Sequence, residues 1–170
     1  MTHRAQGGAV GRAGVAQRSW ISLKRADFAA ALAAPILSKS LHFVLHHTAA
    51  WPDSAVAQAG RRVVQELSTG NAPRGASSVD NNQPPSRWWL GLVVPKRHAK
   101  RAVTRTLLKR QMRAQAQGHH PWLPPGQWLV RLRAPFDARQ YPSAASAALG
   151  EAARKELEQV FAEAAAAMSA

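Results

Sequence analysis

The chain has 170 residues, enough for one domain with a modest core. Lysine and arginine number 23 against 9 acidic residues, a formal charge of +14 that repels itself in the compact state and favours a polyanionic partner. There is no cysteine, which excludes disulfides and thiolate metal sites and agrees with a cytoplasmic location. No apolar run approaches the roughly 20 residues of a bilayer-spanning helix, and the N-terminus lacks the apolar core of a signal peptide.

The first predicted elements are a basic arm and a short helix. Residues 1–20 are rich in Gly, Ala, Arg and Gln without an apolar period, so we expect a disordered arm ahead of a single domain at 21–168. A short helix follows and ends before Pro35, because a residue that precedes proline disfavours helical geometry. Its apolar residues are Leu23, Phe28, Ala31 and Leu32.

Two strands are predicted on either side of a long loop. The sequence LHFVLHH (41–47) predicts a strand with Phe43 and Leu45 on one face. Residues 49–86 are mostly Ala, Pro, Ser, Gly, Asn and Gln, which predicts a loop insertion with one helical turn at 61–67. The sequence RWWLGLVV (87–94) is apolar on both faces, as is typical of a central strand.

The C-terminal half predicts helix, strand and helix. A basic helix runs from about Lys100 to Gln117 and ends at Gly118. Residues 127–133 alternate, and an Ala-rich helix extends to about Met168. Trp128, Val130 and Leu132 share one face of the strand, and the apolar residues of the last helix recur at helical spacing: Leu149, Ala153, Leu157, Val160, Phe161 and Ala164. The order of elements predicts an α/β sandwich of one sheet and a few helices.

The basic helix carries the main functional signal. Residues 87–133 contain eleven Lys or Arg and no Asp or Glu, whereas a solvated surface usually mixes both signs. Arg101, Arg105, Lys109 and Arg113 form a row at i,i+4 spacing that we call the cation row, with Arg110 beside it. Residues expected to face the sheet are Val103, Leu107, Leu108, Met112 and Ala114. Like charges at this spacing repel, so we expect phosphates to compensate them.

No catalytic or metal site of protein residues is predicted. The acids before the last helix are widely spaced, and the histidine doublets His46-His47 and His119-His120 lie in no acid–base pattern. His98 lies among Lys96, Arg97 and Lys100, where contact with a phosphate is the favoured interpretation.

The segment Leu90–Arg110 (LGLVVPKRHAKRAVTRTLLKR) resembles the signature of the ribonuclease P protein family. The matching residues are Lys96-Arg97, Lys100-Arg101-Ala102, Arg105 and Lys109-Arg110. Thr106 and Leu107 stand where that family usually has Asn and Arg, which removes one cation. LKRADF (23–28), LHFVLHH and WLVRLRAP (128–135) resemble other family segments, so the likeness covers roughly 22–48 and 87–161 in order.

The resemblance implies a two-layer fold of helix, three strands, helix, strand and helix with a left-handed crossover. It also implies a protein subunit of a ribonucleoprotein endonuclease for tRNA processing, in which Mg²⁺ is bound mainly by a catalytic RNA subunit. That RNA would contact Lys96, Arg97, Lys100, Arg101, Arg105, Lys109, Arg110 and Arg113. The single-stranded 5′ leader of precursor tRNA would lie in a cleft lined by Phe28, Leu32 and His46, and the rings of Phe28 and His46 suit stacking on unpaired bases.

Two alternatives from other classes stay open. A structural RNA-binding protein of ribosomal type would need the same charge, although it gives no reason for the ordered signature. A basic DNA-binding or peripheral membrane protein would have to expose the apolar half of the basic helix, which Trp88, Trp89 and Trp128 need as a cover. We expect neither membrane attachment nor a stable protein partner.

Overall fold

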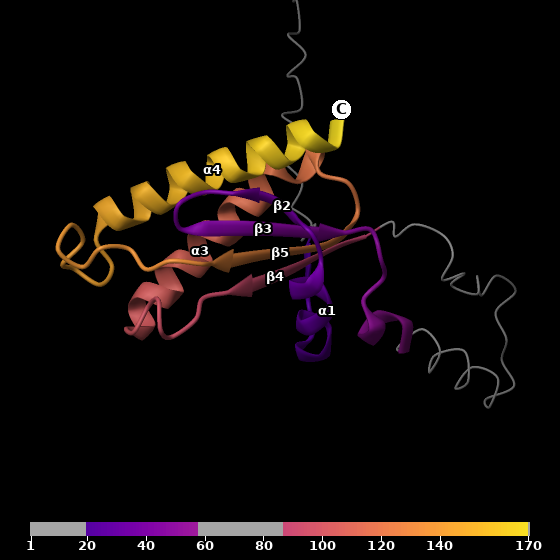
Figure 1. The fold of residues 1–170 in the computed structure, drawn as a ribbon, viewed down its shortest axis with the longest axis horizontal. Helices are drawn as coiled ribbons and strands as arrows, with labels where there is room; N and C mark the ends of the chain where they lie inside the picture. Colours follow the sequence, from indigo (N-terminus) through magenta and orange to yellow (C-terminus); the bar gives the residue numbers. More distant parts are fainter. Residues whose placement is uncertain (1–19, 58–86, 170) are drawn as a thin grey trace, which may run out of the picture.

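A computed structural model describes residues 20–57 and 87–169 (Figure 1). Its elements in chain order are β1 (Trp20–Ser22), a 3₁₀ turn (Arg25–Asp27), α1 (Phe28–Ala33), β2 (Ile36–Lys39), β3 (Phe43–Thr48), β4 (Trp88–Val93), α3 (Ala102–His119), a second 3₁₀ turn (His120–Trp122), β5 (Gly126–Leu132) and α4 (Ala147–Ser169). The strands form one open mixed sheet in the order β1-β4-β5-β3-β2. β1, β4 and β5 are parallel, and β3 is antiparallel to both of its neighbours, β5 and β2.

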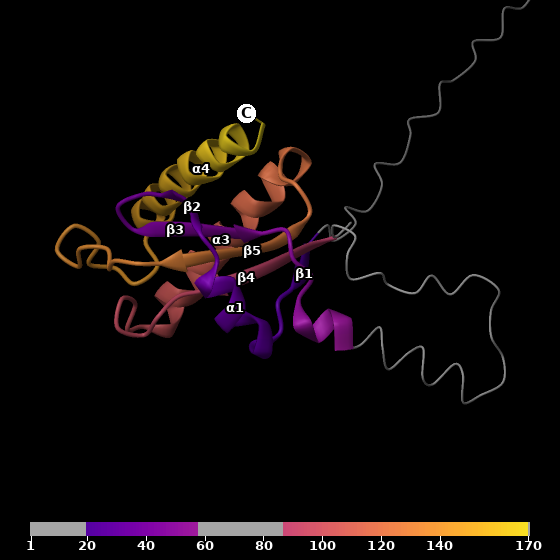
Figure 2. The same ribbon diagram turned by 45° about the vertical axis from the view of Figure 1, so that its right-hand side comes forward.

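Helices cover both faces of this sheet (Figures 1 and 2). α3 and α4 pack on each other and cover one face, the main core face, whereas α1 lies on the opposite face, the α1 face. The expected two-layer sandwich is therefore corrected to a sheet between two helical layers. The reason lies in β4 and β5, because their alternation sends Trp89 and Leu129 to the α1 face, where α1 packs over them.

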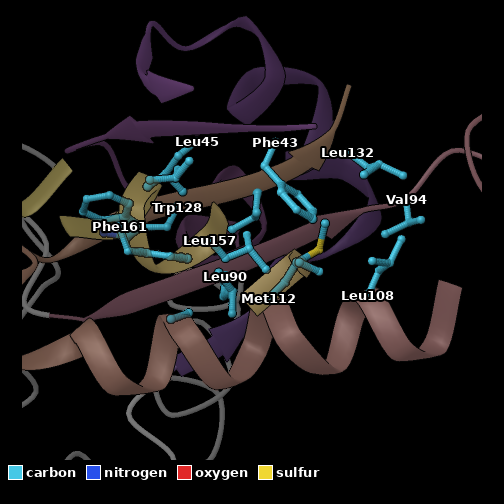
Figure 3. Packing of buried hydrophobic residues seen from close by; sticks show 14 of the residues in the cluster. Phe43, Leu45, Leu90, Val94, Leu108, Met112, Trp128, Leu132, Leu157 and Phe161 are labelled. Atoms are coloured by element: carbon cyan, nitrogen blue, oxygen red, sulfur yellow. The ribbon is translucent and has the colours of Figure 1, made fainter. Parts of the chain in front are cut away.

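The main core lies between the sheet and the pair α3 and α4 (Figure 3). Trp128, Val130 and Leu132 share the inward face of β5, as the alternation predicts, and all three are buried. They pack with Phe43 and Leu45 of β3. α4 is confirmed as well, since it buries Leu149, Ala153, Leu157, Val160, Phe161 and Ala164.

A smaller core lies on the α1 face. It consists of Leu23, Ala31, Trp89 and Leu129, with Phe28 and Trp51 packed against it. Gly91 of β4 lies opposite Leu129, and a Cβ at this position would be only 2.8 Å from Leu23 and 3.1 Å from Phe28. The absence of a side chain at Gly91 therefore lets Phe28 lie directly on the sheet.

The helix ends follow local chemistry. α1 ends at Ala33, and Ala34 is extended at ψ 152°, as expected for a residue before Pro35. α4 begins after Ser146, whose Oγ accepts the backbone N–H of Leu149 at 3.1 Å. α3 passes through Gly118 and ends at His119, two residues beyond the predicted end, since Gly118 keeps an ordinary helical φ.

The residue pattern alone missed two short strands and part of the core, although the order implied by the resemblance, with three strands between the first two helices, includes β2. β1 and β2 showed no pattern in the residues themselves, and Trp20, assigned to the arm, begins β1. Trp51, assigned to the loop, packs edge-to-face on Trp89 at 5.2 Å, and residues 53–57 are helical. The rest of the predicted arm (1–19) and loop (58–86), including the turn at 61–67, lies outside the described residues.

Candidate nucleic-acid interface

The basic loop (96–101) and the exposed side of α3 carry a cationic surface on the main core side of the sheet. Lys96, Arg97 and Lys100 of the loop are exposed, as are Arg101, Lys109, Arg110 and Arg113 of the helix. The ion pairs among residues 20–57 and 87–169 are His42–Glu156, Arg154–Glu158 and Lys155–Glu151. No acid of the described residues therefore neutralises the cations that the sequence singled out.

The start of α3 adds to this surface. Its first turn contains no acid, and Arg101 occupies the N-cap position without a side-chain cap. Helix N-termini expose backbone N–H groups and favour negative charge, which makes cations here unfavourable for the isolated helix. An anionic ligand would relieve both the repulsion and the uncapped N–H groups.

Arg105 differs from the rest of the cation row. It is half-buried, and its Nη1 donates to the carbonyls of Ala99 at 3.0 Å and Lys100 at 2.6 Å. Four residues of α-helix turn roughly 40° beyond a full circle, so a row at i,i+4 winds around the helix. Within α3 the row thus lies near the core side at Arg105 and reaches solvent at Lys109 and Arg113. Arg105 shapes the basic loop, and the sequence alone did not indicate this role.

The same geometry corrects the predicted inner face of α3. Leu107, Leu108 and Met112 are buried as expected, together with Ala116. Val103 is 57% exposed and Ala114 is also exposed. Both lie more than about 120° from the centre of the buried stripe when each residue turns 100°. Their assignment to the sheet side was wrong.

The three residues assigned to the leader cleft all belong to the α1 face. Phe28 is half-buried over Gly91, and Leu32 is 39% exposed on α1. His46 is only 4% exposed, and its Nδ1 lies 2.8 Å from the carbonyl of Ala34 at the end of α1. The ring of His46 is thus a buried polar group whose faces are not open to solvent, while Phe28 and Leu32 line the surface.

Arg131 is a further residue of this face that the sequence analysis did not select. It lies between Val44 of β3 and Val93 of β4 in the sheet register. Its Nε is buried without a hydrogen-bond partner, as is Nε2 of His46. The signal was present in QWLVRLR, because the alternation that puts Val130 and Leu132 on one face sends Arg131 to the other.

The buried carboxylate of Asp27 has a structural role. Asp27 is 1% exposed and accepts the backbone N–H of Ser54 at 3.0 Å, its hydroxyl at 2.5 Å and the backbone N–H of Lys24 at 3.2 Å. The described residues contain no group of three or more His, Asp or Glu that could hold a metal ion. None of their helices is long and apolar enough to cross a membrane.

Comparison with known proteins gives one consistent result. The model of the ribonuclease P family matches residues 22–164. The chain is 41% identical over 81 residues to the ribonuclease P protein component of Ralstonia pickettii (strain 12J), covering 48% of this chain and 55% of that protein. It is 41% identical over 72 residues to the protein of the same name in Burkholderia pseudomallei (strain 1106a), covering 42% and 53%. The matched stretch spans about half of these relatives. No solved structure matches significantly.

Proposed function

The chain belongs to the ribonuclease P protein family, and we propose that it is the protein subunit of the ribonucleoprotein that removes the 5′ leader of precursor tRNA. It binds the catalytic RNA subunit and the leader, and the complex cleaves the phosphodiester that joins leader and mature tRNA. The observation that carries this proposal is the cationic surface of the basic loop and α3, which no carboxylate of the described residues neutralises. The role places the chain in the cytoplasm with RNA as its partner.

The protein's part is to bind and to screen charge. Each phosphate that Lys109 or Arg113 neutralises releases condensed counterions, which favours association at low salt. The basic loop, fixed by Arg105, adds cations beside the N-terminus of α3. We also assign the connection from β4 through α3 to β5 the left-handed crossover that the resemblance implies, an exception to the general rule.

Hydrolysis is assigned to the RNA subunit and the Mg²⁺ that it binds. Mg²⁺ requires oxygen ligands in near-octahedral geometry. Neither the buried Asp27 nor the half-buried Glu156 fits this requirement, because Asp27 accepts hydrogen bonds from Ser54 and Lys24, and Glu156 is engaged with His42 and Ser40. We therefore assign the binding of Mg²⁺ to the RNA subunit, and no step of the reaction to the described residues.

The α1 face is the surface proposed for the leader. Phe28 and Leu32 offer apolar area for unpaired bases, which stack without sequence preference. Arg131 is half-buried and adds a cation within the same face. This surface lies on the side of the sheet opposite α3 and α4, so leader and RNA subunit would contact different sides of the protein.

Reconstitution tests the proposal as a whole. Purified protein should leave precursor tRNA intact, and addition of a ribonuclease P RNA subunit at low Mg²⁺ should restore cleavage at the leader junction. A Lys109→Ala, Arg113→Ala double variant should bind that RNA with a salt dependence lower by about one unit of slope per lost contact. Cleavage by RNA-free protein, surviving nuclease treatment of the preparation, would contradict the proposal.

Phe28→Leu tests the leader surface, since leucine keeps apolar packing but removes the aromatic ring. We expect the holoenzyme to lose roughly 1–3 kcal/mol of affinity for precursor tRNA, the usual contribution of base stacking. Affinity for mature tRNA, which has no leader, should stay unchanged. Trp122→Leu is the matched control, because it makes the same kind of change at an aromatic residue that is 64% exposed. Trp122 lies in the turn after α3 and is not part of the α1 face cluster. Equal losses for both tRNA forms would show that Phe28 acts only through packing.

A further inference from the structure

A cavity of about 880 Å³ lies beside the cationic surface and is not used by the proposed leader contact. It is partly open to solvent and is lined by the basic loop, the start of α3, the turn between β2 and β3, and the segment that joins β5 to α4. Its volume falls in the range of roughly 300–1,000 Å³ that is usual for small-molecule sites. The chemistry of its lining divides into three groups: cations (Arg97, Lys100, Arg101), rings (His42, Phe136, Tyr141) and aliphatic side chains (Leu41, Leu108, Leu149).

The rings form a stack on the cavity wall. His42 and Phe136 lie almost parallel, with centroids 3.9 Å apart and planes at 12°. Tyr141 meets Phe136 edge-on at 5.7 Å. All three are half-buried, so each contributes both to packing and to the wall. Flat apolar surfaces of this kind favour a further flat ring, such as a nucleobase.

Glu156 fixes the position of His42 through hydrogen bonds. Its Oε1 lies 2.6 Å from Nδ1 of His42, and its Oε2 accepts the hydroxyl of Ser40 at 2.7 Å and the backbone N–H of His42 at 3.1 Å. Burial alone would raise the pKa of Glu156, but these hydrogen bonds together hold it below its ordinary value. The carboxylate is therefore engaged with the turn between β2 and β3.

The rim of the cavity is positively charged, and hydrogen bonds from side chains fix its backbone carbonyls. The carbonyls of Ala99 and Lys100 are held by Arg105, and the hydroxyl of Thr104 donates to the carbonyl of Ala144 at 2.7 Å. Arg97 and Lys100 make no ion pair with a carboxylate of the described residues. Asp137 is the acid among the lining residues, and its Oδ1 accepts the backbone N–H of Arg139.

We propose that this cavity binds one unpaired nucleotide of the RNA subunit, with the base on the stack of His42 and Phe136 and the phosphate on Lys100 and Arg101. The proposal rests on the proposed function for the source of the RNA. Cations on the rim and rings on the wall match the two parts of a nucleotide, whereas an acidic peptide would leave the rings unused. The site lies on the α3 and α4 side of the sheet and is separate from Phe28.

The first test separates base from phosphate with free ligands on the full chain. Nuclear magnetic resonance titrations compare adenosine 5′-monophosphate with ribose 5-phosphate, following the signals of His42, Phe136 and Tyr141. We expect the nucleotide to bind about tenfold more tightly, as base stacking on an aromatic ring allows. Phe136→Leu should abolish this preference, and Lys100→Gln with Arg101→Gln should weaken both ligands. Equal binding of the two ligands to the unaltered protein would overturn the proposal.

The second test identifies the source of the nucleotide. Phe136→Leu should lower affinity for the RNA subunit about tenfold, while Trp122→Leu, an exposed aromatic outside the cavity, should leave it unchanged. Thermal melts check both variants for folding, and the exposed Lys100 and Arg101 variants replace Phe136→Leu if it unfolds. An RNA subunit that binds both aromatic variants equally would overturn the proposal. A preference for the nucleotide without any binding of RNA subunit would instead refute the proposed function and leave the cavity as a nucleotide site.

Discussion

The two faces of the sheet are buried to very different degrees. On the main core face, seventeen buried residues from strands, α3, α4 and the loops next to them form one cluster. On the α1 face, a helix of six residues covers a cluster of four. The same strands supply both faces, so strand composition alone does not explain the difference. What differs is the length of helix that each connection provides.

The smaller cover leaves polar groups without partners. Among the described residues, buried side-chain atoms that lack a hydrogen bond include Nε2 of His46, Oε1 of Gln127 and Nε of Arg131, and all three residues alternate onto the α1 face. An unsatisfied buried polar group costs about 1–3 kcal/mol. A face that keeps several of them, beside the half-buried Phe28, is better suited to a ligand than to stability. The main core face, which is closed by α3 and α4, therefore maintains the fold. The α1 face, which is the more open of the two, is available for binding. We call them the closed face and the open face.

The largest expected effect tests the closed face. Phe161→Ala removes a fully buried ring from the middle of α4, and large-to-small changes of this kind cost about 3–5 kcal/mol. Leu32→Ala on the open face should cost no more than about 0.5 kcal/mol, because Leu32 is exposed. Chemical denaturation measures both values. Similar losses for the two variants would refute the division of roles between the faces.

A smaller effect is expected where the open face touches the sheet. Gly91→Ala would put a Cβ 2.8 Å from Leu23 and 3.1 Å from Phe28, so one of these side chains must move. We expect a loss of about 1–3 kcal/mol in stability, typical of overpacking, together with weaker binding of precursor tRNA. Gly118→Ala is the control, since a Cβ there meets nothing within 4 Å and alanine should stabilise α3 by up to about 1 kcal/mol. A stabilised Gly91→Ala protein would mean that Phe28 does not rest on this glycine.

The main core was predictable from the sequence because it depends on period. Leu149 to Ala164 follow the helical repeat, and Trp128, Val130 and Leu132 follow the strand repeat, and both sets are buried as expected. The cation row was also visible as a spacing. The role of Arg105 was not, because the winding of the row becomes decisive only when the helix has been placed against its neighbours.

The open face was harder to predict because its contacts are non-local. Trp51 joins a cluster that depends on Trp89, and Asp27 is satisfied by Ser54, twenty-seven residues later. A composition of Ala, Pro and Ser around Trp51 suggested a loop, and only the fold brings that residue to the core. Arg131 was not predicted for a related reason, because the alternation in its strand indicates the apolar face clearly and says little about the role of the opposite face.

The smallest effect concerns pH and belongs to the edge of the closed face. The ring centroid of His47 lies 4.2 Å from that of Trp128. The ring centroid of His120 lies 4.3 Å from that of Trp88 and 5.4 Å from that of Trp20. Burial lowers the pKa of both histidines below 6.5, although a hydrogen bond to the carbonyl of Pro125 partly offsets this for His47. Between the lowered pKa values and about pH 6.5, the unfolded chain therefore binds more protons than the folded one. The contribution of the two neutral histidines to the free energy of unfolding should be complete above about pH 6.5, and it should decline as the pH falls below this value.

His120→Phe isolates one of these groups while keeping a ring against Trp88. The variant should lose part of the decline in denaturation midpoint between about pH 6.5 and the lowered pKa, since phenylalanine takes up no proton. At neutral pH it should be at least as stable as the unaltered chain, because Nε2 of His120 is buried without a partner. A further decline below pH 4.5 should persist in both proteins, since the lowered pKa of Glu156 stabilises only the ionised carboxylate. An unchanged pH profile in the variant would show that His120 is not a source of the acid sensitivity and that the closed face owes it to other groups.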